Sequence, residues 1–229
     1  MHEELYKKSH SKEEAFARFC AVVEALRSDE GCPWDRAQTH ESLRRWMIEE
    51  AYELVEAIER KDRDNMIEEL GDVFLQVLMH SQIARERGEF SITEVMEFGS
   101  EKMLRRHPHV FAANVENCAN NEPLSVDNVL ELWENVKSKE KAESSITSSM
   151  EAIPARLPAL LRSEKIQRKA AKVGFDWPDM SGAFDKLQEE LEELKLAVKE
   201  EDSGHIKEEL GDLLFAVTNV ARFLDIDPE

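Results

Sequence analysis

Acidic residues at helical spacing occur twice in this chain, and they are the residues best suited to chemistry. The second set follows the first by 140 residues, so that residues 46–84 align with residues 186–224 without a gap. Of these 39 positions 12 are identical, and most of the identical residues are acidic. A repeat that served only packing would share mainly apolar residues, so the shared acids indicate a function. The two sets are Glu49, Glu50, Glu53, Glu69 and Asp72, and Glu189, Glu190, Glu193, Glu209 and Asp212.

Helical geometry predicts that the acids of each set meet at the edge of a core-facing surface. Glu50 interrupts an apolar stripe, and at about 100° per residue Glu49 and Glu53 lie to one side of it. Glu69 and Asp72 share a flank of the next helix, and a short turn can bring the two flanks together. The apolar residues expected to face the core are Leu43, Trp46, Met47, Leu54, Ala57 and Ile58, and Ile67, Leu70, Val73, Phe74 and Val77.

A group of four or five carboxylates in an apolar setting must take up protons, stay hydrated or bind cations. Ligand sets made only of oxygen favour a hard ion, Mg²⁺ or Mn²⁺, which also binds phosphate oxygens. A solvated acidic face is the alternative, and it is the interpretation we give to Glu68 and Glu208, which point away from the other acids. A di-iron bundle is disfavoured because Glu50-Ala51-Tyr52-Glu53 lacks the Glu-x-x-His pattern.

Composition predicts an all-α protein. Gly and Pro number only 8 and 7 in 229 residues, and 41% apolar residues are enough for a core. A net charge of −19 argues against a nucleic-acid polymer or an anionic membrane as partner. Cys20, Cys32 and Cys118 form neither a disulfide framework nor a CxxC motif, and residues 1–12 lack a signal core. We therefore expect a soluble, cytoplasmic protein.

Capping residues and periodicity give the expected helices and domains. Ser11, with Glu14 at the capping-box position, and Ser91, with Glu94, each precede a helix. Residues 107–123 are expected to form a loop, and the polar stretch near residues 144–153 a linker between domains 1–143 and 154–229. The expected helices are 12–27, 41–60, 63–87, 92–106, one that starts at 125, 157–172, 181–201 and 203–223.

At this point the sequence resembles a known family. Glu49-Glu50-Ala51-Tyr52-Glu53 followed by Glu68-Glu69-Leu70-Gly71-Asp72 is similar to the EExxE…ExxD signature of the MazG nucleoside triphosphate pyrophosphohydrolases. The segments 31–35 (GCPWD), 106–111 (RHPHVF) and 173–177 (VGFDW) also match this family. The resemblance implies tandem four-helix-bundle domains, Mg²⁺ dependence and homodimerisation. It also implies hydrolysis of NTPs or dNTPs to the monophosphate and pyrophosphate.

The resemblance also assigns roles to residues. It implies that Glu49 and Glu189 ligate metal or orient water, and that Lys102 and Arg106 bind phosphate, with Arg105 in the same basic turn. It places Trp133 near the nucleotide base; a core position for Trp133 and a helix-dipole role for the basic turn stay open. The metal ligands carried over are Glu50, Glu53, Glu69, Asp72, Glu190, Glu193, Glu209 and Asp212.

The two halves are unequal. The counterpart of Lys102 would fall at position 242, beyond Glu229, so the second domain is C-terminally incomplete within this chain. We therefore favour the first domain as the active one, although in the family the C-terminal domain is often active. A second site that borrows cations from another subunit is the alternative.

Three functions compete at this stage. The leading one is a metal-dependent NTP pyrophosphohydrolase of broad specificity that cleans the nucleotide pool. A narrower enzyme of the same superfamily, dUTPase-like or a phosphoribosyl-ATP pyrophosphohydrolase, is the close alternative. A non-catalytic helical dimer that uses its metal sites as a scaffold belongs to a different class.

Overall fold

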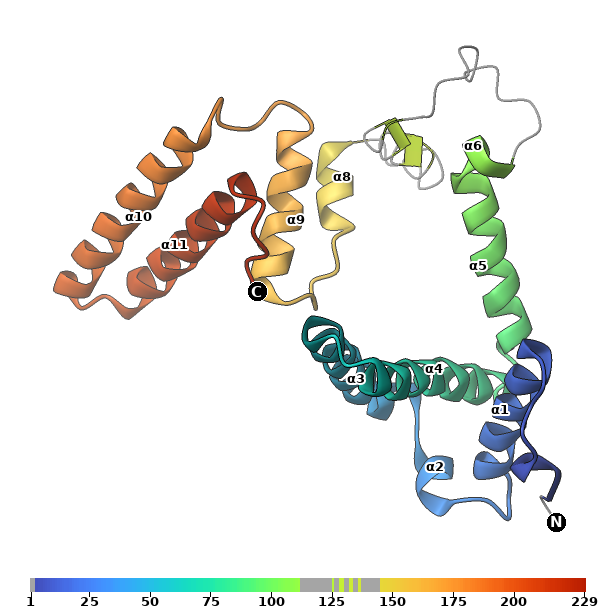
Figure 1. Ribbon diagram of the computed structural model, residues 1–229. Coiled ribbons are helices and arrows are strands. Elements are labelled where there is room, and N and C mark those ends of the chain that lie inside the picture. Colours follow the sequence, from blue (N-terminus) through green and yellow to red (C-terminus); the bar gives the residue numbers. More distant parts are fainter. Residues whose placement is uncertain (1–2, 112–124, 126–127, 130–131, 134–135, 137–144) are drawn as a thin grey trace. The chain divides into compact units, whose positions relative to one another are not determined.

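A computed structural model of the protein describes residues 3–111, 125, 128–129, 132–133, 136 and 145–229 (Figure 1). Within these residues all regular structure is helical, which confirms the predicted all-α class. The chain divides into two compact units, Met1–Pro123 and Leu124–Glu229. In the described part of the chain, no helix is long and apolar enough to cross a membrane.

The first unit is built around an antiparallel helical hairpin, α3 and α4 (Figure 1). α1 begins after Ser11 as predicted, but Glu14 accepts from the backbone N–H of His10 at 2.7 Å rather than completing a capping box. The capping box of Ser91 with Glu94 is present. The helices are η1 (Glu3–Tyr6), α1 (Lys12–Arg27), α2 (Pro33–Ala37), α3 (His40–Arg60), α4 (Arg63–Glu86), α5 (Ile92–Arg106) and α6 (Pro108–Phe111).

One tight turn shapes both hairpins and explains part of the sequence repeat. Lys61 adopts the left-handed conformation, with φ of 54°, and Asp62 then caps α4 by accepting from the N–H groups two and three residues on. Glu201 (φ 60°) and Asp202 repeat this arrangement before α11. The shared aspartate is therefore structural, and the turn fixes the register of the acids on the two helices.

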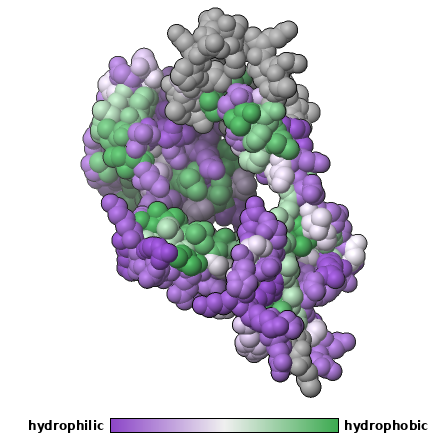
Figure 2. Space-filling view, turned by 45° about the vertical axis from the view of Figure 1, so that its right-hand side comes forward, coloured by the Kyte–Doolittle hydropathy of each residue, from purple (hydrophilic) through white to green (hydrophobic). Residues whose placement is uncertain are grey.

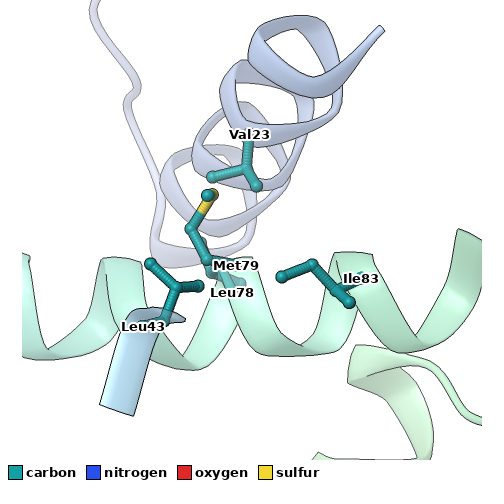
Figure 3. Close-up of a cluster of buried hydrophobic side chains, with 5 residues drawn as sticks. All are labelled: Val23, Leu43, Leu78, Met79 and Ile83. Carbon is teal, nitrogen blue, oxygen red and sulfur yellow. The ribbon is translucent and has the colours of Figure 1, made fainter. Parts of the chain in front are cut away.

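The core of the first unit lies where α1 crosses the hairpin (Figure 3). Val23, Leu43, Leu78, Met79 and Ile83 converge there from α1, α3 and α4, and Phe16, Phe19, Cys20, Leu75 and Ile92 pack around them.

The prediction that the whole apolar stripe of α4 is buried was wrong. Ile67 and Leu70 are 53% and 51% exposed, and Trp46 and Ile58 on α3 are also exposed. The physical reason is that α1 covers only the part of the hairpin that contains Leu78 and Ile83. The other part lacks a covering helix among the described residues of this unit.

The second unit repeats the hairpin as α10 (Met180–Glu200) and α11 (Ser203–Phe223). α9 (Ala159–Ala171) packs on α11, and α8 (Ile146–Glu151) packs on α9. The segment predicted as a linker thus contains a short helix, capped by Ser145. The domain limits at residues 143 and 154 stay a prediction.

The structure also bears on two other predicted segments, the helix from Ser125 and the loop after α5. The helix predicted from Ser125 is supported where it is described, since Asn128 donates its N–H to Ser125 Oγ at 3.2 Å and residues 128–129, 132–133 and 136 are helical. Leu130 and Cys118 lie outside the described residues. Residues 108–111, which were predicted to be part of a loop, form the short helix α6. Cys20 and Cys32 are free thiols.

Gly182 at the start of α10 allows one aromatic side chain to lie against the helix. A Cβ atom at this position would lie 2.6 Å from Cε3 of Trp177, which is closer than packed atoms approach. The absence of a side chain at Gly182 therefore positions the indole beside the α9, α10 and α11 helices.

Candidate active site

The α3–α4 hairpin brings together the carboxylates of Glu50, Glu69 and Asp72. One oxygen from each lies within 4.8 Å of the others. Glu53 lies near them, since its charge is among those that raise the pKa of Glu50. Three donors at this separation, from two helices fixed by one turn, form a site that can hold a hard divalent cation, because every ligand atom is a carboxylate oxygen.

Electrostatics supports this assignment. Burial raises the pKa of Glu50 above its ordinary value, and the neighbouring charges of Asp72, Glu53 and Glu69 raise it further. Burial, followed by the charges of Glu53 and Asp72, likewise raises the pKa of Glu69. Each ionised acid destabilises the next, so the cluster binds positive charge, whether a proton or a metal ion.

The α10–α11 hairpin forms a second cluster from Glu190, Glu193 and Glu209, again with oxygens within 4.8 Å of one another. Glu190 and Glu209 are buried, and Glu193 is exposed. Burial and the charges of Glu209 and Glu190 raise the pKa of Glu193. Each hairpin therefore brings three of its five predicted acids together, and the predicted metal-binding role of these acids stays a prediction.

Two basic side chains, Lys186 and His205, contact the second cluster. Lys186 Nζ lies 2.7 Å from Glu189 Oε1 and 2.8 Å from Glu190 Oε1, and these hydrogen bonds raise the pKa of Lys186. His205 Nε2 lies 2.9 Å from Glu209 Oε1. The equivalent positions of the first repeat hold Trp46 and Asn65. Sequence reasoning missed both contacts, although each basic residue precedes its acid by four positions, the spacing at which side chains on a helix meet.

The remaining acids differ in their surroundings. Glu49 forms an ion pair with Arg45, whose Nε lies 2.7 Å from Glu49 Oε1, and Glu189 pairs with Lys186. Glu68 and Glu208 are exposed, as predicted. Asp212 lies on the wall of a cavity beside the second cluster. The roles assigned to Glu49, Glu189 and Asp212 stay predictions.

The basic turn of α5 stands apart from the carboxylates within one chain. Lys102 Nζ lies 6.0 Å from the ring centroid of Phe98, and Arg105 Nη1 lies 3.9 Å from Glu101 Oε2. Arg106 is half-buried. α5 leaves the end of α4 and extends away from the α3–α4 hairpin, so its last turn does not reach the cluster (Figure 1). Trp133 is helical, half-buried and part of the second compact unit.

Comparison with known proteins places this arrangement in a family. The MazG nucleotide pyrophosphohydrolase domain matches residues 38–111 and 182–228, which together are more than half of the chain and contain both carboxylate sets. The nucleoside triphosphate pyrophosphohydrolase/pyrophosphatase MazG of Thermotoga maritima is 48% identical over 214 residues, covering 93% of this chain and 78% of that protein. The nucleoside triphosphate pyrophosphohydrolase of Escherichia coli K12 is 40% identical over 216 residues, covering 93% and 79%. The uncharacterised protein YabN of Bacillus subtilis is 50% identical over 215 residues, covering 93% and 42%. The chain therefore belongs to the MazG nucleotide pyrophosphohydrolase family.

Proposed function

We propose that this protein hydrolyses nucleoside triphosphates, with ribose or deoxyribose, to the monophosphate and pyrophosphate, and that it uses Mg²⁺ to do so. The observation that carries this proposal is the meeting of Glu50, Glu69 and Asp72 on the α3–α4 hairpin. The relatives from Thermotoga maritima and Escherichia coli, which are named as nucleoside triphosphate pyrophosphohydrolases, support it. The free thiols of Cys20 and Cys32 and the acidic charge fit a cytoplasmic enzyme without a nucleic-acid polymer or membrane as partner.

The acids of the first unit have two different roles in the proposed reaction. Glu50, Glu53, Glu69 and Asp72 would hold the metal, which when bound neutralises triphosphate charge and acidifies a water molecule. Attack of water forms one bond at the α-phosphorus and breaks its bond to the bridging oxygen of the pyrophosphate, and a base must accept the proton. Glu49, oriented by Arg45 at the edge of the cluster, is the base we propose in the first unit.

The first unit is the one that we propose to be active. Burial and the neighbouring carboxylates raise the pKa values of Glu50 and Glu69, so a cation entering the cluster removes carboxylate repulsion. In the second unit the ammonium group of Lys186 already pairs with Glu190, and His205 Nε2 lies 2.9 Å from Glu209 Oε1. These contacts favour a non-catalytic, structural role for the second cluster. This role is the alternative to catalysis in the second unit.

We further propose that the protein is a homodimer joined through the first unit. Ile48, Tyr52 and Val55 share the outer face of α3 and are 57%, 54% and 48% exposed. Exposed apolar side chains of this kind gather in patches on the surface (Figure 2). At the equivalent positions α10 has Gln188, Glu192 and Lys195, which hydrogen-bond to one another. The same face is thus apolar in one repeat and solvated in the other, as expected if only the first is covered by a partner.

Phosphorus NMR of the products tests the activity and its location. Wild type, Glu53→Ala and Glu193→Ala would each be incubated with a dNTP and Mg²⁺, with Glu59→Ala and Glu192→Ala as exposed controls on the same two helices. We expect monophosphate and pyrophosphate from wild type and from both controls, and loss of turnover in Glu53→Ala alone. Loss in Glu193→Ala alone would move the reaction to the second unit. Release of orthophosphate, or no turnover in wild type, would overturn the proposed function.

A further inference from the structure

Two histidine side chains meet at the open end of the α3–α4 hairpin, the end away from its turn. Nδ1 of His40, the first residue of α3, lies 2.7 Å from Nδ1 of His80 on α4. The two rings are nearly parallel, with 3° between their planes and 5.0 Å between their centroids. Both side chains are half-buried, and the core residues Leu43 and Met79 are close to them in the chain. The pair therefore joins the two helices beside the core.

A hydrogen bond between two Nδ1 atoms limits how many protons the pair can hold. A ring nitrogen that carries a proton donates and one without a proton accepts, so the bond needs a single proton between the two atoms. One further proton can be added to the pair, because a cationic ring can donate to a neutral one. When both rings are cationic, both Nδ1 atoms carry a proton, the bond is lost and the two charges repel each other. The pair therefore holds only while at least one ring is neutral.

The surroundings of the pair favour one positive charge and oppose a second. Burial, followed by the charge of His40, lowers the pKa of His80 below its ordinary value of about 6.5. Hydrogen bonds from its own N–H and from Thr39 lower the pKa of Glu41, and the charges of Arg87 and His40 add to this effect, so one negative charge lies near the pair. Burial, followed by the charge of Glu24, raises the pKa of Cys20 on α1, so its thiol is neutral. Other charged side chains on the adjoining segments are paired as follows: Arg27 with Glu86, Glu24 with Arg85, and Arg36 with Asp29.

The second hairpin has two apolar residues at the equivalent positions. The 140-residue offset of the repeat takes His40 to Met180, at the start of α10, and His80 to Val220 on α11. Val220 is 9% exposed, so an apolar side chain packs well at this position. Packing of the hairpin end therefore does not require histidine. Two titratable groups in contact at this end of the first hairpin indicate a response to protons.

The pair and the turn hold the first hairpin on either side of its carboxylate cluster. Along α3, Glu50 lies about 15 Å from His40 and about 16 Å from the turn at Lys61. We infer that His40 and His80 form a proton-sensitive clamp, which keeps the open end of the hairpin closed at neutral pH and releases it when acid places a proton on both rings. The link to the cluster rests on the proposed function, because a metal ion held by carboxylates of both helices would oppose the same opening.

Hydrogen exchange of the full chain, followed by mass spectrometry, tests the clamp. Protection factors of peptides from residues 43–50 would be measured at pH 7.5 and 5.5. At pH 5.5, about one unit below the ordinary pKa of histidine, an open state that takes up one more proton gains about tenfold over the closed state. We therefore expect the protection of α3 in wild type to fall about tenfold as the pH is lowered. The double variant His40→Met/His80→Val, which copies the apolar residues of the second hairpin, should change less than about twofold. His10→Gln, an exposed control, should respond like wild type.

A single variant covers the case in which the double variant does not fold. Glutamine keeps a hydrogen-bonding group but does not take up a proton, so the protection of His80→Gln should also change less than about twofold. No fall in wild type, or an equal fall in wild type and His80→Gln, would overturn the clamp.

Mn²⁺ tests the link between the clamp and the cluster. Saturating Mn²⁺ at pH 5.5 should restore the protection of wild type, and it should not do so in Glu50→Gln, which lacks a carboxylate of the cluster. An equal effect of Mn²⁺ on both proteins, or none on wild type, would overturn this link. Release of pyrophosphate from dNTPs at pH 7.5, measured on the same samples, reports on the proposed function separately.

Discussion

Arg222 at the end of α11 forms a two-pronged ion pair with Asp176, which lies just before α10. Arg222 Nη2 is 2.5 Å from Asp176 Oδ1 and Nη1 is 3.0 Å from Oδ2, while Nε donates to Asn219 Oδ1 at 2.9 Å. In the first unit Arg27 of α1 binds both carboxylate oxygens of Glu86 at the end of α4, at 2.9 and 2.6 Å. In each unit a buried arginine therefore anchors the end of the hairpin's second helix to a neighbouring segment.

The ion pair of Asp176 makes the stability of the second unit depend on pH. The hydrogen bonds from Arg222 lower the pKa of Asp176 below its ordinary value of about 3.8. Stability from this pair is therefore present above about pH 4 and is lost as the pH falls through the lowered folded-state pKa. Asp176→Asn should lower the free energy of unfolding by about 2 kcal/mol near pH 7.

Urea unfolding at pH 7 and at pH 3 measures this effect. The difference between wild type and Asp176→Asn should shrink at the lower pH, because the wild-type carboxyl group begins to take up a proton there. Asp185→Asn, an exposed change on α10, serves as the control and should behave like wild type at both values. A difference that stays constant, or grows, toward low pH would contradict the assignment.

Glu50 should be essential for metal binding but not for folding. It lies among apolar residues on α3, and a glutamine has almost the same shape without the charge that repels Glu69 and Asp72. We expect Glu50→Gln to weaken Mn²⁺ binding at the first cluster about tenfold or more, with an unchanged circular dichroism spectrum. Glu59→Gln, an exposed position on the same helix, is the matched control in calorimetric titrations. Unchanged Mn²⁺ affinity in Glu50→Gln would show that the acids do not form a metal site.

Local sequence signals predict the long helices of this fold. The N-cap residues Ser11, Asp62 and Ser91 and the apolar spacing determine where α1, α4 and α5 begin, and both kinds of signal act within a few residues. The exposure of Ile67 and Leu70 was not predictable in this way. Burial depends on which other helix reaches a surface, and the spacing of a stripe does not contain that information.

In the candidate sites, too, the sequence predicts local features but not those that depend on long-range packing. Glu50, Glu69 and Asp72 could be placed together because they lie on two helices joined by a short turn. The cavity beside the second cluster, whose wall includes Gln167, depends on how α9 packs against α11, which is a long-range contact. No pattern in the sequence near residue 167 distinguishes a glutamine in a cavity wall from one in contact with water.

Removal of Lys186 should increase the metal affinity of the second cluster in the absence of nucleotide. Its ammonium group lies 2.8 Å from Glu190 and must give up that contact before a divalent ion can bind there. Lys186→Met should therefore bind Mn²⁺ several-fold more tightly at this cluster, while Lys195→Met, which removes an exposed partner of Glu192, should not. The measurement is the electron paramagnetic resonance signal of free Mn²⁺ during titration. Weaker binding in Lys186→Met would show that the lysine supports the metal site instead of competing with it.

The apolar outer face of α3 should decide the oligomeric state. Ile48, Tyr52 and Val55 lie on the side of the helix opposite Glu50 and Ala57, so a change there leaves the carboxylate cluster untouched. A charge placed in the middle of this face would be buried without a partner if two copies meet there. We expect sedimentation equilibrium to give the mass of a dimer for wild type and of a monomer for Val55→Glu. Val95→Glu, the same change at an exposed position of α5, is the control and should remain dimeric. A dimeric Val55→Glu, or a monomeric wild type, would mean that this face does not join two subunits, and the different chemistry of the two repeats would then require another partner.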